Sequence, residues 1–554
     1  MGEIMIGKQI NAVLVFVVVG TLAFTSQSFA HDQEEHDDAS LPPLILGVLD
    51  FPNSGAAAAQ DAFSRGVMLL HSFEFDDAHS AFLAAQAIDP GFAMAIWGEA
   101  MTFNHPLWAQ QDREEALKAL AKLGPRGSVR ATEHEQRYLD AAATLYGEGS
   151  KQQRDIAYME AMRSLQEDYP DDLEAATFYG LSILSSVYQR DFRTYMKAAS
   201  VLEEVFAKQP QHPGAAHYLI HSYDDQIHAP LGLRAARAYN KIAPSATHAQ
   251  HMVSHIYMSL GMWDEVVTAN QNAVRVSEDS LRRAGKPIAN RRKHALSWLQ
   301  YALLQQGRVE EALETMRTMH NDIAEVQNED QQYHNTLMRS IYIIEDPTAE
   351  QILDTQDTSM FPLDEKAVEA FASGFRYVAL NDLDSARYEL ESLQKNIVAA
   401  KVLSVAEGLH EDDNATSEDG YNIATIFARE LQALIYFREG DAETALQLLA
   451  DAAEDENARP MEYGPPYVSK PSSELMGEML LTLDRPGEAI AHFETALERS
   501  TGRTLSLLGL ARAQEAAGDP AAQETWGILE GSWKADMEKL RQTDYVWLST
   551  GETT

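Results

Sequence analysis

The sequence predicts an all-α protein in which antiparallel helical hairpins stack into a solenoid. Ala-, Leu-, Glu- and Gln-rich amphipathic segments dominate, short Gly- or Asp-containing turns separate them, and strands do not alternate with helices. Similar residues recur at a spacing of 34, so that His217 and His221 return as His251 and His255. With 554 residues, the chain is too long for one compact core, which favours several domains or a repeat array.

The first 30 residues have the features of a secretory signal peptide. Lys8 precedes an apolar run over residues 12–24, and small residues precede a cleavage site after Ala30. Residues 31–50 are expected to form a mobile leader. We therefore expect an exported protein, periplasmic or secreted, with no membrane span after cleavage; an uncleaved N-terminal anchor is the alternative.

Cysteine content and charge exclude several classes of function. The chain has no cysteine, which excludes disulfides, thiolate metal sites, CxxCH haem attachment and cysteine nucleophiles. Its formal charge is −40, from 84 acidic and 44 basic residues. Such a surface repels nucleic acid and anionic membranes and attracts cations, so no nucleic-acid partner is expected. A solvated acidic shell explains most of this charge equally well.

The repeats can be followed along the chain. One set of small and aromatic residues near the N-terminus has the same spacing as a set near the C-terminus: Gly66, Ala78, Phe82 and Ala85 against Gly477, Ala489, Phe493 and Ala496. Further hairpin turns are expected at Gly261, Gly307, Gly440 and Gly518, and another hairpin is marked by Gly374, Tyr377 and Ala386. We divide the array into a His-rich part, residues 51–360, and a second part, residues 361–545.

This pattern resembles the tetratricopeptide repeat (TPR) family, which implies a right-handed α-solenoid with a concave groove lined by the first helix of each hairpin. With Pro244 at position 32, repeats begin at Pro213 and Thr247. In the family, positions 2, 5, 9, 12 and 13 line the groove. That frame places His217 and His221 at positions 5 and 9, and it places His251 and His255 at the same two positions of the next repeat.

The histidines predict a metal site on adjacent repeats. Residues i and i+4 of a helix share one face, so each HxxxH pair presents two imidazoles in one direction. The candidate ligands are His217, His221, His248, His251, His255, Asp224, His71 and His105. Zinc or copper suits such ligands, and iron requires Asp224 or Asp225 to join them. A metal-free histidine groove for an acidic or polar partner and simple packing are the alternatives.

Signals for catalysis are weak. Neither HYLIH nor HMVSH is an HExxH motif, and no phosphate loop, GxSxG elbow or Ser/His/Asp arrangement is present. We therefore expect an exported scaffold that binds a protein or peptide in the groove. The alternatives are a metal-dependent periplasmic hydrolase or oxidoreductase and a metal-free adaptor of an envelope complex. Residues 89–108, 212–244, 248–267 and 463–481 resemble a family of exported bacterial TPR proteins of unassigned activity.

Overall fold

The computed structural model describes residues 43–548, except residues 189, 327–328, 352–357, 360, 408–417 and 462. The predicted signal peptide and the first part of the predicted leader lie outside this range. From Pro43 onward the chain forms one compact unit. The described part is almost entirely helical, which confirms the predicted all-α class. No helix within it is long and apolar enough to cross a membrane.

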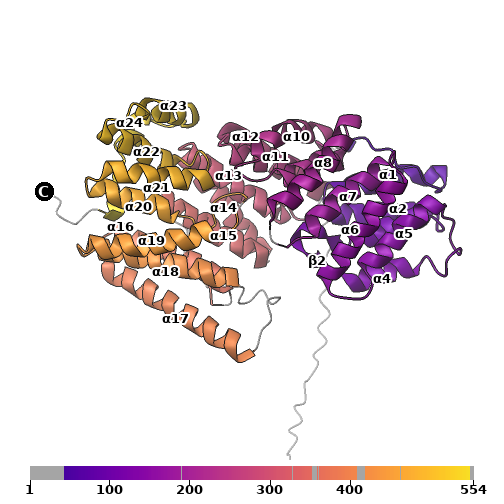
Figure 1. Cartoon of the computed structure of the whole chain (residues 1–554), viewed down its shortest axis with the longest axis horizontal. Helices are drawn as coiled ribbons and strands as arrows, with labels where there is room; N and C mark the ends of the chain where they lie inside the picture. Colours follow the sequence, from indigo (N-terminus) through magenta and orange to yellow (C-terminus); the bar gives the residue numbers. More distant parts are fainter. Residues whose placement is uncertain are drawn as a thin grey trace, which may run out of the picture. The chain divides into compact units, whose positions relative to one another are not determined.

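Figure 1 labels most of the elements, which are numbered in chain order. The helices of the first half are α1 (Gln60–His71), α2 (Phe75–Ile88), α3 (Ala93–Met101), α4 (Arg113–Ala121), α5 (Glu133–Leu145), α6 (Lys151–Asp168), α7 (Leu173–Ser185), α8 (Phe192–Lys208), α9 (Pro213–Ser222), α10 (Ala229–Ile242), α11 (Thr247–Ser259), α12 (Trp263–Arg283), α13 (Lys293–Gln305) and α14 (Val309–Glu325). They are followed by α15 (Glu329–Glu345), α16 (Leu363–Ala379), α17 (Leu383–Glu407), α18 (Glu418–Arg438), α19 (Ala442–Ala458), α20 (Ser472–Thr482), α21 (Pro486–Arg499), α22 (Thr504–Ala517), α23 (Ala522–Ser532) and α24 (Met537–Arg541). Two short strands, β1 (Asn104–His105) and β2 (Gln110–Gln111), pair antiparallel between α3 and α4.

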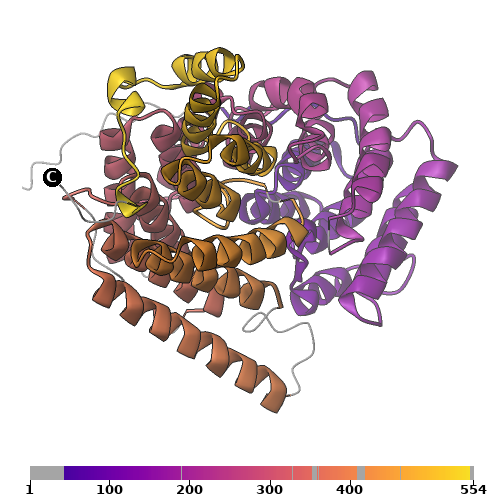
Figure 2. The ribbon, with the colours of Figure 1, turned by 60° about the vertical axis from the view of Figure 1, so that its left-hand side comes forward.

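Consecutive helices pack as hairpins, and neighbouring hairpins stack on one another (Figure 1 and Figure 2). The long helix α17, for example, packs on both α16 and α18. The glycines expected at hairpin turns all follow a first helix and all have positive φ: Gly261, Gly307, Gly440 and Gly518. Glycine adopts this left-handed conformation without a Cβ clash, which is why these turns could be located from the sequence.

The repeated Gly/Phe spacing corresponds to a repeated packing contact. A Cβ on Gly66 or Gly98 would lie 2.8 or 2.2 Å from the ring of Phe82. The C-terminal copy is the same, because Cβ atoms on Gly477 and Gly509 would lie 2.8 and 2.2 Å from the ring of Phe493. The aromatic ring of a second helix thus fills the space left by glycines on the first helices of its own and the next hairpin. This packing confirms a TPR-type solenoid.

Part of the segment expected to be a mobile leader is bound to the first array. Leu46 is buried, and the backbone N–H of Val48 donates to the carbonyl of Gln211 at 3.0 Å. Gly47 has a φ of 111° and approaches Pro213 and Ile242 so closely that a Cβ would lie within 3.0 Å of both. Residues 43–50 therefore pack against the α8–α9 and α10 region instead of forming a free leader.

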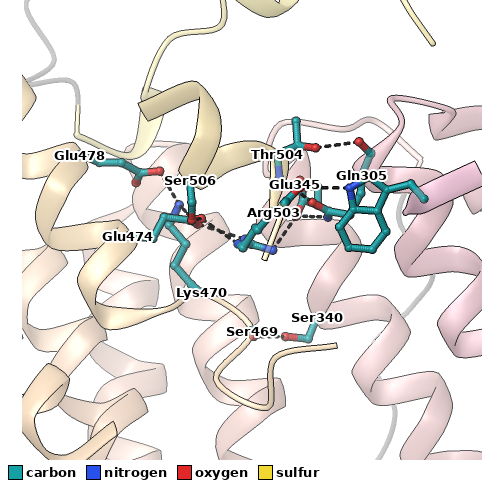
Figure 3. Close-up of polar contacts among 12 residues, drawn as sticks. Gln305, Ser340, Glu345, Ser469, Lys470, Glu474, Glu478, Arg503, Thr504 and Ser506 are labelled. Carbon is teal, nitrogen blue, oxygen red and sulfur yellow. Dashed lines mark hydrogen bonds and ion pairs between the residues drawn. The ribbon is translucent and has the colours of Figure 1, made fainter. Parts of the chain in front are cut away.

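A buried network of charged side chains links Glu345 of α15 with α20 and the start of α22. Arg503 donates to Glu474 at 2.7 and 3.0 Å and to Glu345 at 3.1 Å, while Lys470 lies 2.6 Å from Glu478 (Figure 3). Although burial alone would raise the pKa of Glu474, Arg503 and Lys470 lower it to about 2. The carboxylate therefore stays charged and paired.

Two hydrogen bonds between Thr504 and Gln305 extend this connection to α13. Thr504 donates its backbone N–H to Gln305 Oε1 at 2.8 Å and its hydroxyl to the Gln305 carbonyl at 2.7 Å (Figure 3). Since α13 also carries His294, the C-terminal array is attached to one of the helices that build the histidine site.

Candidate metal centre

Three first helices carry the histidines. The helices α9 and α11 begin at Pro213 and Thr247, as the repeat frame predicts, and α13 begins at Lys293. Proline at the first position suits a helix start, where its missing N–H would have had no partner. His212 caps α9 with its ring, since Nδ1 accepts the backbone N–H of Ala215 at 3.2 Å. Each HxxxH pair then lies on one helical face.

Each HxxxH pair is completed by the histidine at the second position of the following hairpin. We call these sets group 1, consisting of His217, His221 and His248, and group 2, consisting of His251, His255 and His294. Within each group, one nitrogen per residue lies within 4.8 Å of the other two. The groups adjoin, with ring centroids 6.4 Å apart for His248 and His251 and 6.3 Å apart for His221 and His255.

In group 2, hydrogen bonds determine which nitrogens carry protons. Nδ1 of His255 lies 2.6 Å from Asp224 Oδ2, and a carboxylate can only accept, so Nδ1 carries the proton. Nδ1 of His251 lies 2.7 Å from Asn270 Oδ1. The amide nitrogen of Asn270 donates to the Val266 carbonyl, which fixes that oxygen as an acceptor. In their neutral forms both rings therefore present bare Nε2 atoms, and these lie only 3.2 Å apart.

Group 1 has a different polarity. Nδ1 of His217 donates to the His71 carbonyl at 2.6 Å, which leaves Nε2 as an acceptor. This Nε2 lies 3.1 Å from Nε2 of both His221 and His248. Arg292 donates to Nδ1 of His248 at 2.8 Å, and a guanidinium cannot accept, so neutral His248 carries its proton on Nε2. His248 can thus donate to His217, and this pair is satisfied by hydrogen bonding alone.

Burial favours the neutral form of five of these six imidazoles. It lowers the pKa of His217 to about 3, because the charged form would lose its hydration. Burial also lowers the pKa values of four further members well below the ordinary range, and neighbouring positive charges add to the effect: His221, His248, His251 and His294. Neutral imidazole is the form that binds metal ions.

Aromatic side chains enclose both groups. The ring of Phe73 lies 4.5 Å from that of His217. Trp298 lies 4.8, 4.3 and 5.4 Å from the rings of the three members of group 2. The proline-rich connector between α19 and α20 reaches the same place. Its Tyr463 ring lies 6.0 Å from that of His255, and a Cβ on Gly464 would lie 2.6 Å from Trp298. The connector therefore covers part of group 2.

His71 belongs to a third set, with Glu174 and His212, in which every polar atom has a partner. Glu174 accepts from Nε2 of His71 at 2.7 Å and from Nε2 of His212 at 3.0 Å. Nδ1 of His71 lies 3.0 Å from the Tyr218 hydroxyl. Burial alone would raise the pKa of Glu174, but His212 and His71 lower it to about 2. This set is satisfied by its own hydrogen bonds, and it supports His217 through the His71 carbonyl.

The remaining predicted ligands lie outside the two groups. His105 stacks on Phe75 with centroids 4.1 Å apart. Asp224 contacts His255 on the side away from Nε2, so it orients the ring. Asp225 pairs with Arg190 at 3.1 Å and with His228 at 2.9 Å. The structure thus brings together the side chains of five of the eight predicted ligands, and it places His294 with them.

The histidines at positions 5 and 9 were expected to line an open groove, and instead they are largely buried. His217 and His251 are 0% exposed and His255 is 5% exposed. Sequence reasoning also missed Asn270, Arg292 and Tyr463. Each comes from a second helix, a helix start or a distant connector, and nothing in the spacing pointed to any of them.

Comparisons with known proteins add only general likeness. No protein-family model and no curated protein matches the sequence. Among solved structures, it is similar to the TPR domain of P58(IPK) (13% identity, 83% of this chain and 99% of that one, TM-score 0.24). It is also similar to the human IFIT1 dimer with PPP-AAAA (12% identity, 86% of this chain and 95% of that one, TM-score 0.32). A third similar structure is that of yeast Tom70 (13% identity, 87% of this chain and 87% of that one, TM-score 0.26).

Proposed function

We propose that this protein is a TPR-type scaffold that binds a transition-metal ion at group 2. The observation that carries the proposal is the pair of bare Nε2 atoms 3.2 Å apart on His251 and His255. Two lone pairs facing at this distance repel each other unless a cation lies between or beside them. Only a proton or a metal ion can fill that role. Burial lowers the pKa of His251, which disfavours a proton on that ring, and a nitrogen of His294 converges on the same point. A metal ion is therefore favoured.

The distance also suits coordination. Bonds of about 2.0–2.1 Å from zinc to imidazole nitrogen imply nitrogens about 3.3–3.4 Å apart in a tetrahedron. Asp224 and Asn270 accept from the outer nitrogens of the two rings, and this orients the rings and raises their basicity. Asp224 also has a buried Oδ1 without a hydrogen-bond partner, so its negative charge is available to balance an ion.

The donor set favours zinc or copper over iron. All three converging atoms of group 2 are imidazole nitrogens. The nearest carboxylate, Asp224, is bound to the far side of His255 and does not join them. Non-haem iron sites of the facial type require a carboxylate ligand together with two histidines, whereas imidazole alone suits zinc and copper.

A metal-dependent hydrolase or oxidoreductase is the second candidate, and one observation favours it. Group 2 supplies three protein ligands, the number found in catalytic zinc sites, which keep the fourth position for water or substrate. The two candidates can be separated by replacing the metal with Co²⁺ and adding azide. A shift of the visible spectrum indicates an open position, and an unchanged spectrum indicates a closed site.

The proposal is tested by metal analysis of purified protein after Zn²⁺ or Cu²⁺ loading and desalting. We expect at least one ion per chain in the unaltered protein and its loss in His255→Ala, with circular dichroism confirming the fold. The control is His320→Ala, which removes an exposed histidine of α14 and leaves the metal content unchanged. An unaltered protein without metal, or a folded His255→Ala protein with full metal content, contradicts the proposal.

Export and a protein or peptide partner complete the proposed role. The N-terminal signal features support export to the periplasm or beyond, and N-terminal sequencing of the mature protein tests cleavage after Ala30. Helical-hairpin solenoids offer extended surfaces for partners. Because three of the four histidines at positions 5 and 9 are buried and the fourth is half-buried, a partner would bind outside groups 1 and 2.

A further inference from the structure

Groups 1 and 2 present similar nitrogens to their centres, but one ligand of group 1, His248, has an outer partner of the opposite hydrogen-bonding character. In group 2 the outer nitrogens of His251 and His255 meet oxygen acceptors on Asn270 and Asp224. In group 1 the outer nitrogen of His248 meets a donor, Arg292, at 2.8 Å. An acceptor beside Nδ1 holds the proton on Nδ1 and leaves the lone pair on Nε2, which faces the centre of the group. A donor beside Nδ1 places the proton on Nε2 instead.

This difference determines whether an ion can bind. To ligate through Nε2, His248 must move its proton to Nδ1, where the guanidinium of Arg292 now donates. Arg292 must therefore turn away first. A carboxylate that could take over the guanidinium lies near, on Glu74. Glu74 accepts the backbone N–H of His248 at 2.8 Å, so it lies beside the same residue.

We infer that group 1 is a second ion site whose affinity Arg292 lowers through its hydrogen bond to His248. The inference rests on the proposed function of group 2 and extends it to a two-ion centre with unequal sites. Three features fit group 1 to an ion of the same class. Its three ligand nitrogens converge within 4.8 Å. His217 already donates outward, to the His71 carbonyl. Two of the nitrogen pairs are 3.1 Å apart, close to the edge of a coordination tetrahedron.

The experiment is a Zn²⁺ titration of the chelator-treated full chain by calorimetry, with a competing chelator to reach tight affinities. For the unaltered protein we expect two binding events, with the second at least about tenfold weaker, the lower end of the effect of outer hydrogen-bond partners on metal affinity. Arg292→Gln should strengthen the second event about 10- to 100-fold, because its amide oxygen can accept from Nδ1 of His248. Adding His221→Ala to Arg292→Gln should abolish that event and leave the first.

The matched control is Arg292→Met, which removes the same charge and offers no acceptor. We expect it to strengthen the second event less than Arg292→Gln does. Equal gains in the two variants mean that charge alone sets the affinity, and they overturn the role assigned to the hydrogen bond. One Zn²⁺ per chain in both the unaltered protein and Arg292→Gln overturns the second site and leaves the proposed function standing. No Zn²⁺ in any form overturns the proposed function itself.

Discussion

Acidification should destabilise the metal-free protein through its buried neutral histidines. Besides His251 and His255, whose Nε2 atoms face each other, the two groups contain four histidines. Their folded-state pKa values lie far below the unfolded value of about 6.5: His217, His221, His248 and His294. The unfolded chain therefore binds more protons below that pH, and stability falls as the pH falls. For His217 the loss continues down to its folded pKa of about 3.

The size of the effect follows from linkage. Between pH 7 and pH 5.5, each histidine that titrates only when unfolded costs about 1.3 kcal/mol, so four cost about 5 kcal/mol. An unfolding entropy of about 2.1 cal/mol/K per residue makes this a fall in Tm of about 5 °C for about 500 residues. Calorimetry in buffers of different ionisation enthalpy also measures the protons taken up on unfolding at pH 5.5.

Other buried groups also titrate, so the decisive quantity is the difference from a variant. His221→Asn combined with His294→Asn removes the two partly exposed members of the set. Proton uptake at pH 5.5 should fall by about two, and about half of the Tm loss should disappear. His320→Asn, at an exposed position, is the control and should change neither quantity. A difference of less than about half a proton refutes the reasoning about buried neutral imidazoles.

Three further predictions concern the site and the fold. Asp224→Asn should weaken ion binding at group 2 by about 10- to 100-fold in a Zn²⁺ titration, because the ring of His255 loses its charged acceptor; unchanged affinity contradicts the orienting role. Gly98→Ala should lower the free energy of unfolding by about 1–3 kcal/mol in denaturant titrations, since its Cβ would lie 2.2 Å from Phe82. An unchanged free energy of unfolding would mean that the Phe82 ring moves aside without cost. Glu474→Gln should cost about 3–5 kcal/mol, because it leaves Lys470 and Arg503 buried without their shared carboxylate; thermal unfolding measures this, and a change in Tm of less than about 1 °C refutes it.

Much of the fold was predictable because its determinants are local. Glycines at positive φ mark the hairpin turns, and the frame that they share with Pro244 places the starts of α9 and α11 at the observed residues. The HxxxH pairs follow from helical geometry alone. The third histidine of each group comes from the next hairpin. Its place beside the pair could be inferred only as far as the repeat stayed regular.

The third ligand of group 2 shows where that regularity fails. Helix α12 has 21 residues, whereas α10 has 14, so His294 lies farther along the chain than the 34-residue period places it. The outer partners were also beyond prediction, because Arg292 and Asn270 reach the histidines from elements whose side-chain directions depend on packing. The buried network around Lys470 and Glu474 is a long-range contact of the same kind.

The position of Tyr463 in the chain has a consequence for the order of events during synthesis. All six histidines of groups 1 and 2 precede residue 300, whereas the connector that lies beside His255 is made much later. A growing chain, folding from its N-terminus, can therefore assemble its imidazoles while they are still accessible from that side. In the finished protein the end of this connector is held by the ion pairs of Lys470 with Glu474 and Glu478. The Tyr463–Gly464 segment must then be displaced before an ion can enter or leave by that route.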